Sequence, residues 1–212
     1  MTKFIALEPS WDFNSFEPHI SELAMFTHWN QLHKKYVNSL NDLAKKYPNI
    51  VEHKASEVLR NPNSYFDSED DKVKYVNNMG GHLCHTLFWY CISPQGTIKP
   101  TRFFDTNRKD IEKHLKDEGL ARFGSGWSWL LLNGKNELDC YSTQNHNTPF
   151  MRLQVPLLCI DLWEHAYYLD YLGARKDWLD TIMKFVDWTK VDYILTRYLN
   201  DGVYIIDDML TN

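Results

Sequence analysis

Apolar side chains return at helical spacing through the first half of the chain. Between residues 17 and 47, apolar and aromatic positions recur every three or four residues, and Pro48 ends the pattern. The polar stretch 52–71 carries the turn cluster Asn61–Ser64, and we expect its charges to face solvent. A second apolar segment, about 71–91, stops before Pro94. Together these segments predict a helical hairpin.

Shorter runs of a different kind follow. Residues 106–120 have the pattern of a charged amphipathic helix, whereas 127–132, 137–142 and 155–160 have the pattern of strands. Asn133 and Gly134 lie between the first two strand runs, and an Asn-Gly pair in that place is a strong hairpin signal. We expect residues 175–199 to form closing helices.

The order of these elements predicts an α+β fold. We expect an N-terminal α-helical hairpin lobe, residues 1–96, and a C-terminal lobe, residues 97–212, in which helices flank a small three-stranded antiparallel sheet. The chain has 212 residues, of which 43% are hydrophobic, so it can bury a core in one compact unit or in two small lobes.

Charge and targeting signals narrow the function classes. A net charge of −5, with Lys and Glu evenly scattered, speaks against a surface for nucleic acid or anionic membranes. No run approaches transmembrane length, and the first residues show no signal or transit peptide. The four cysteines lack CxxC spacing, which favours thiols in a reducing compartment. We therefore expect a cytoplasmic protein without a nucleic-acid or membrane partner.

The most distinctive chemistry lies just after the third strand run. Asp161 ends this run, and His165 follows four residues later, with Trp163 between them. A carboxylate and an imidazole at the end of a buried strand indicate a metal, and this mixed set suits redox-active manganese or iron better than structural zinc. The alternative is an Asp cap with a polar His nearby, because capping Asp residues are common. Both interpretations stay open on these residues alone.

Further histidines lie within the expected helices. His28 falls in the first, where one histidine on an apolar face is more often a hydrogen-bonded core residue than a ligand. His82 and His85 are one turn apart on the second and could chelate one ion. Gly80 and Gly81, beside them, each cost about 1 kcal/mol relative to Ala in a helix, so we expect another group to approach the backbone closely there.

Three blocks of sequence follow one another as they do in a known enzyme family. Residues Asp161–Leu169 read DLWEHAYYL, with Tyr171 beyond them. Residues Met79–His85 read MGGHLCH and lead into TLFW, and Phe123–Trp129 reads FGSGWSW. The segment 17–38 fits the family's opening helix. From about Glu17 to about Trp188, the chain resembles the iron/manganese superoxide dismutases.

The resemblance implies a ligand set and a reaction. It places one manganese or iron ion per subunit on His28, His85, Asp161 and His165, and it leaves His82 to packing or hydrogen bonding. It implies that the ion cycles between M3+ and M2+, which converts two superoxide anions into dioxygen and hydrogen peroxide.

The resemblance also implies catalytic roles around the ion. Tyr36 matches the gateway tyrosine, which hydrogen-bonds the network of the solvent ligand. Trp127 and Trp163 match the aromatic cage, and Trp89 lies near it. Glu164 matches the residue that contacts the ligand histidine of the other subunit, which implies a homodimer or a homotetramer. Such a carboxylate, next to a ligand in the buried centre, would need that partner.

Two departures from the family pattern concern the metal and the subunit contact. The usual glutamine near the solvent ligand is absent, since the manganese-type position holds His146 and the iron-type position holds Gly81. His146 is therefore a candidate catalytic residue, while Gly80, Gly81 and Phe88 favour manganese weakly. Leu32 replaces the second gateway histidine, so Tyr168 would lose its usual partner across the dimer.

Three function classes compete on this fold. The first is an active superoxide dismutase, and the second is a catalytically inactive structural or interaction protein, as in relatives that have lost ligands. The third is a metal-binding module without turnover, which differs from the enzyme only in redox tuning. The four intact ligand positions favour the active enzyme. Lys34 and Lys35, beside Tyr36, could form a cationic rim that draws superoxide inward, or an ordinary solvated helix face.

Overall fold

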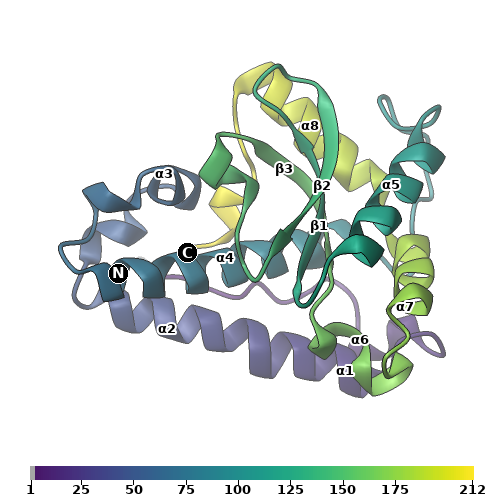
Figure 1. The fold of residues 1–212 in the computed structure, drawn as a ribbon, viewed down its shortest axis with the longest axis horizontal. Coiled ribbons are helices and arrows are strands. Elements are labelled where there is room, and N and C mark those ends of the chain that lie inside the picture. The colour runs from purple at the N-terminus through teal and green to yellow at the C-terminus, as the bar shows by residue number, and fades with distance from the viewer. Residues whose placement is uncertain (1–2) are drawn as a thin grey trace.

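The first half of the chain folds as a helical hairpin. In the computed structural model, which describes residues 3–212, α1 (Glu22–Thr27), a π-helical segment (His28–His33) and α2 (Lys34–Ala44) form one continuous rod. The long α4 (Glu69–Cys91) lies alongside this rod (Figure 1). The first helix begins five residues later than expected, because Ser21 caps it by accepting a hydrogen bond from the Ala24 N–H.

The connection between the two long helices contains a helix that the sequence pattern did not predict. α3 (Ala55–Arg60) buries Ala55, Val58 and Leu59. These positions lie on one face of a helix. The helix is only about a turn and a half long and has polar neighbours, so its apolar spacing does not stand out in the sequence. The charged side chains of residues 52–70 are exposed, as expected, but the description of this connection as polar was wrong for these three residues.

The predicted three-stranded antiparallel sheet is confirmed. β1 (Gly126–Leu132) lies between β2 (Leu138–Gln144) and β3 (Val155–Asp161). The β1–β3 register shifts where β1 passes from Leu130 to Leu131, opposite Pro156. Proline has no N–H to donate to a ladder, which explains why the irregularity falls there. Between this irregularity and the start of β1 the pairing is regular, and Trp127 lies opposite Asp161.

The β1–β2 hairpin forms at the predicted place, although its turn differs in detail. The Asn133 N–H donates to the Glu137 carbonyl at 2.9 Å, and the Asn136 N–H donates to the Asn133 carbonyl at 3.0 Å. The residue with positive φ is Asn136, at 60°, rather than Gly134. Asparagine tolerates this left-handed conformation better than most residues, so it can take the role usually given to glycine.

Helices cover both faces of the sheet, as Figure 1 shows. α5 (Arg108–Ala121) packs on one face, where the Ser128 hydroxyl donates to the Leu115 carbonyl at 2.7 Å. Strand side chains alternate between faces, so Trp127 and Asp161 point the other way, towards α4. The sheet therefore presents Asp161 to the helical hairpin.

Three further helices complete the C-terminal part: α6 (Glu164–Tyr171), α7 (Arg175–Ile182) and α8 (Trp188–Asp201). α7 packs on α5, and α8 packs on α4 and β3. The predicted α+β fold is confirmed, while a domain boundary between residues 96 and 97 stays a prediction. Within residues 3–212, none of the helices is both long and apolar enough to cross a lipid bilayer.

Candidate metal centre

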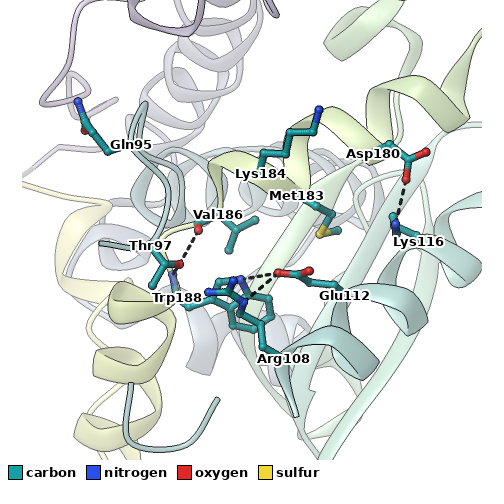
Figure 2. Close-up of a pocket in the computed structure, with 10 residues that line it drawn as sticks. All are labelled: Gln95, Thr97, Arg108, Glu112, Lys116, Asp180, Met183, Lys184, Val186 and Trp188. Atoms are coloured by element: carbon teal, nitrogen blue, oxygen red, sulfur yellow. Dashed lines mark hydrogen bonds and ion pairs between the residues drawn. The ribbon is translucent and has the colours of Figure 1, made fainter. Parts of the chain in front are cut away.

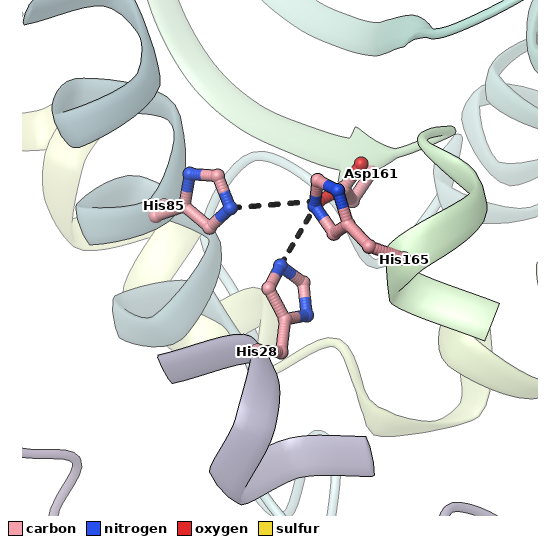
Figure 3. A group of neighbouring side chains, drawn as sticks. All are labelled: His28, His85, Asp161 and His165. Atoms are coloured by element: carbon pink, nitrogen blue, oxygen red, sulfur yellow. Dashed lines mark hydrogen bonds and ion pairs between the residues drawn. The ribbon is translucent and has the colours of Figure 1, made fainter. Parts of the chain in front are cut away.

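Four side chains from four separate elements converge on one point. His28 comes from the start of the π-helical segment, His85 from α4, Asp161 from the end of β3 and His165 from the first turn of α6 (Figure 3). One donor atom from each lies within 4.8 Å of the other three. In the described part of the chain, this is the only such group of His, Cys, Asp or Glu side chains.

The π-helical segment contributes to this convergence. A π-turn holds one more residue than an α-turn, so His28 and His33 come closer to one face of the rod than regular α-helical spacing allows. His28 lies against the His85 ring, and His33 lies against the His82 ring. The rod therefore directs both histidines towards α4, a feature that apolar periodicity does not reveal.

Asp161 uses its two carboxylate oxygens differently. Oδ1 accepts a hydrogen bond from the Trp163 N–H at 2.8 Å, which fixes the turn into α6. Oδ2 lies 3.1 Å from Nε2 of His28, and 3.3 Å from Nε2 of His165. The N-cap of α6 is Trp163 and has no side-chain cap hydrogen bond, so Asp161 fixes the turn before the helix but does not cap it. Its other oxygen faces the imidazoles, as the metal interpretation requires.

The charge state of the group suits a cation. Burial alone would raise the pKa of the Asp161 carboxyl, but the neighbouring imidazoles, His165 foremost, hold it far below its usual range. Burial lowers the pKa of His28 and the pKa of His85. Near neutral pH the centre therefore contains an ionised Asp161 carboxylate and the neutral imidazoles of His28 and His85, the forms that bind metals.

Two buried nitrogens show that the residues fit a metal ion. The His85 Nδ1–H donates to the Gly81 carbonyl at 2.6 Å, so Nε2 of this neutral ring carries a bare lone pair. Nε2 of His85 and Nε2 of His28 are buried and have no hydrogen-bond partner among the described residues. Buried polar atoms are rarely left unpaired without a reason. An ion bound between them and Asp161 supplies that reason.

His146 links the aromatic wall to Tyr36. The Trp127 indole N–H can only donate, and it lies 3.2 Å from Nδ1 of His146. Neutral His146 therefore carries its proton on Nε2, which lies 2.8 Å from the Tyr36 hydroxyl oxygen. Burial lowers the pKa of His146 to about 4, which keeps the ring neutral. Tyr36 accepts this hydrogen bond and keeps its own proton available for another acceptor.

The two glycines of α4 permit this arrangement, as expected from their place in a helix. A Cβ atom on Gly80 would lie 2.1 Å from the His146 carbonyl oxygen. On Gly81 it would lie 2.9 Å from the Tyr36 ring. Both distances are too short for a side chain. α4 can therefore contact His146 and Tyr36 only at positions that lack a side chain.

Trp163 closes the other side of the centre. Its ring stacks on His146, with centroids 4.6 Å apart, and on His165, with centroids 5.5 Å apart. Trp127 approaches the His85 ring edge to face at 5.1 Å. The four candidate ligands thus lie in an aromatic enclosure.

Comparison with known proteins identifies this arrangement. Residues 4–93 match the α-hairpin domain of the iron/manganese superoxide dismutases, and residues 101–193 match their C-terminal domain. The chain belongs to the iron/manganese superoxide dismutase family. It is a superoxide dismutase with a site for one manganese or iron ion per subunit.

Individual relatives agree with this assignment. A manganese superoxide dismutase of Bacillus cereus is 36% identical over 199 residues, which cover 91% of this chain and 94% of the relative. A manganese superoxide dismutase of Listeria innocua is 32% identical over 189 residues, covering 86% and 92%. These comparisons give no support to an inactive structural protein.

Glu164 and Tyr168, which the superoxide dismutase pattern places at the subunit contact, are both exposed in the single chain. Glu164 was expected in a buried centre, but its side chain is 52% exposed, and Ser125 Oγ donates to it at 2.8 Å. The first residue of α6 points outwards from the single chain, which explains the difference. Tyr168, one turn later, is also exposed, at 56%.

A polar surface pocket of about 330 Å3 lies near α5 and residues 183–188 (Figure 2). None of the four candidate ligands lines it. Its charges are largely paired with one another: Arg108 lies 3.3 Å from Glu112, and Lys116 lies 2.9 Å from Asp180. The pocket offers no grouping of metal donors and plays no part in the centre.

Proposed function

We propose that His28, His85, Asp161 and His165 hold the manganese or iron ion with which this superoxide dismutase works. The observation that carries the proposal is the pair of buried Nε2 atoms without a hydrogen-bond partner, on His28 and His85, that face an ionised carboxylate in the centre. The ion held there would supply one-electron redox chemistry between a trivalent and a divalent state, which the conversion of two superoxide anions into dioxygen and hydrogen peroxide requires.

Tyr36 and His146 supply and direct protons in this proposal. Burial raises the pKa of Tyr36 above its ordinary value, so the hydroxyl keeps its proton at neutral pH. Because Tyr36 Oη accepts from His146 Nε2, the hydroxyl proton is free to be donated towards the reduced substrate. Trp127 fixes the His146 tautomer on which this direction depends. Trp127 and Trp163 exclude water from the remaining walls.

His146 also supports a proposal about the metal. The imidazole offers a single N–H on a rigid ring, whereas the glutamine of related enzymes offers an amide with two N–H donors. Here that N–H is already committed to Tyr36. We therefore propose that the centre prefers manganese, as in the named relatives. We also propose that it discriminates less strictly against iron than a centre with the glutamine does, so the iron form retains activity.

Glu164 and its surroundings support assembly into a homodimer or a homotetramer. The exposed Glu164 carboxylate lies at the edge of the centre, one residue before the ligand His165. The side chain of Phe123 is 98% exposed, and Ser125, two residues on, bonds Glu164. Exposed apolar residues beside an exposed carboxylate are typical of a surface that another subunit covers.

The four free cysteines support a cytoplasmic location. Cys84, Cys91 and Cys159 are buried thiols, Cys140 is half-buried, and none is paired in a disulfide. Thiols persist in reducing compartments. We therefore propose that the protein is a cytoplasmic antioxidant enzyme.

The test is to prepare the metal-free protein and load it with manganese, iron or zinc. Zinc suits the same nitrogen and oxygen donors but cannot change its oxidation state. We expect manganese and iron to restore the consumption of superoxide, followed by stopped-flow absorbance, while the zinc form binds its ion and remains inactive. Equal superoxide consumption by the zinc form, or none by either redox-active form, would contradict the proposal.

A further inference from the structure

Behind the metal centre, buried side chains form a line of hydrogen bonds that the proposed reaction does not use. Nε1 of Trp89 lies 3.2 Å from Nδ1 of His33, and Nε2 of His33 lies 2.8 Å from Nδ1 of His82. Nε2 of His82 lies 3.2 Å from the Leu210 carbonyl oxygen. The line joins the π-helical segment, α4 and the C-terminal segment, and all three side chains are buried.

The direction of these hydrogen bonds follows from the group at one end. The Trp89 indole N–H can only donate, so Nδ1 of His33 accepts and the proton of this ring is on Nε2. That proton is donated to Nδ1 of His82, which places the His82 proton on Nε2, facing the Leu210 carbonyl. A second proton on either ring would make its Nδ1 a donor that faces another N–H donor. Both imidazoles are therefore neutral, each in a single tautomer.

Two side chains of this line, His33 and Trp89, lie against metal ligands. The His33 ring is stacked on His85, with centroids 5.4 Å apart and an interplanar angle of 20°. Trp89 meets the His28 ring edge to face, with centroids 4.7 Å apart and an angle of 68°. The hydrogen bonds that orient His33 and Trp89 thus also set the surfaces on which the two ligand rings rest.

We propose that His33 and His82 are positioning residues of the metal centre, which hold the planes of His85 and His28 through the stacked His33 ring and through Trp89. This inference rests on the proposed function. A ligand ring with a fixed plane presents its Nε2 lone pair in one direction. Groups that orient ligands in this way change metal affinity when they are altered, even though they do not touch the ion.

Two substitutions of His82 separate hydrogen bonding from packing. An Asn carbonyl reaches the position of Nδ1 and can still accept from His33, whereas the longer Gln amide reaches the position of Nε2 and cannot. The measurements are the rate of manganese release to a chelator and the electron paramagnetic resonance spectrum of the bound Mn2+. Thermal unfolding of each metal-free protein reports stability separately.

We expect His82→Gln to release manganese about 10- to 100-fold faster than wild type, with an altered spectrum. His82→Asn should keep the spectrum and a release rate near that of wild type. Wild-type release and spectrum in both variants would overturn the proposal. So would equal acceleration in both, since the acceptor at Nδ1 would then have no effect.

Trp89→Phe provides a second route if His82→Gln does not fold. It keeps an aromatic ring beside His28 but removes the N–H that begins the line. We expect faster manganese release and an altered spectrum, and unchanged values of both would overturn the inference. A wild-type protein that binds neither manganese nor iron would instead contradict the proposed function, so the two failures can be told apart.

Discussion

At the scale of single residues, His146 takes its orientation from the one neighbour that can only donate. The Trp127 N–H faces Nδ1, so Nε2 must carry the proton and face Tyr36. The sequence marked His146 as a candidate catalytic residue, but neither neighbour could be named, because positions 36, 127 and 146 meet only in the folded chain. Departures from a family pattern identify such residues, and tertiary contacts assign their partners.

The first prediction concerns the metal preference set by His146. His146→Gln replaces a single committed N–H with a flexible amide, so the ratio of manganese-supported to iron-supported activity should rise several-fold. The ratio is measured on metal-free protein loaded with each ion. His114→Gln, an identical change at an exposed position of α5, is the control and should leave the ratio unchanged. An unchanged ratio in His146→Gln would mean that His146 does not control the metal.

At the scale of elements, contiguous patterns predicted most of the fold. The two long helices were foreseen from apolar positions that recur every three or four residues, and β1 and β3 from nearly continuous apolar runs. The hairpin to β2 was foreseen from the Asn-Gly pair. α3 and the π-helical segment were not foreseen. The first is too short for its period to stand out, and the second changes the spacing itself.

The second prediction concerns the close approach to α4. Gly80→Ala places a Cβ atom against the His146 carbonyl oxygen, a backbone atom that cannot move without shifting the segment after β2. We expect the free energy of unfolding to fall by about 1–3 kcal/mol, together with a loss of bound metal. Chemical denaturation and metal analysis measure the two effects. The control is Gly134→Ala, where a Cβ meets no atom within 4 Å and the change should stay within about 0.5 kcal/mol. Equal stability of both variants would contradict this account of Gly80.

At the scale of the whole molecule, the metal site is the point where the hairpin meets the sheet. Its ligands come from both halves of the chain, so the motifs indicated the chemistry but could not give the geometry. The net charge of −5 is unfavourable for an anionic substrate, and cations near the centre would offset this repulsion. Lys34 is held over the Trp29 ring, 3.9 Å from its centroid, whereas Lys35 is exposed.

The third prediction is that these lysines accelerate the capture of superoxide. Neutralising both, by Lys34→Gln with Lys35→Gln, should lower the rate at low ionic strength and weaken its dependence on salt. Lys135→Gln is the control, because it lies at the hairpin, beyond the end of β1 opposite to Trp127. If the rate and its salt dependence are the same in all forms, the lysines are an ordinary solvated face.

The fourth prediction concerns assembly. Glu164→Ala should weaken the association of subunits and loosen the metal site, because it removes the carboxylate that we place at the contact with the partner's ligand histidine. Sedimentation equilibrium measures association, and metal retention is measured on the same samples. Glu57→Ala is the matched control, since that side chain is also 52% exposed. A stable, fully active monomer of the wild-type protein would refute the role of Glu164.

The central claim is that the four convergent side chains hold the redox-active ion, and Asp161→Ala tests it most directly. The measurement is metal content per chain, determined alongside superoxide consumption for wild type and variant. We predict one manganese or iron ion per wild-type chain, and loss of both metal and activity in a variant that still folds. A folded Asp161→Ala protein that retains its metal and its activity would contradict the claim.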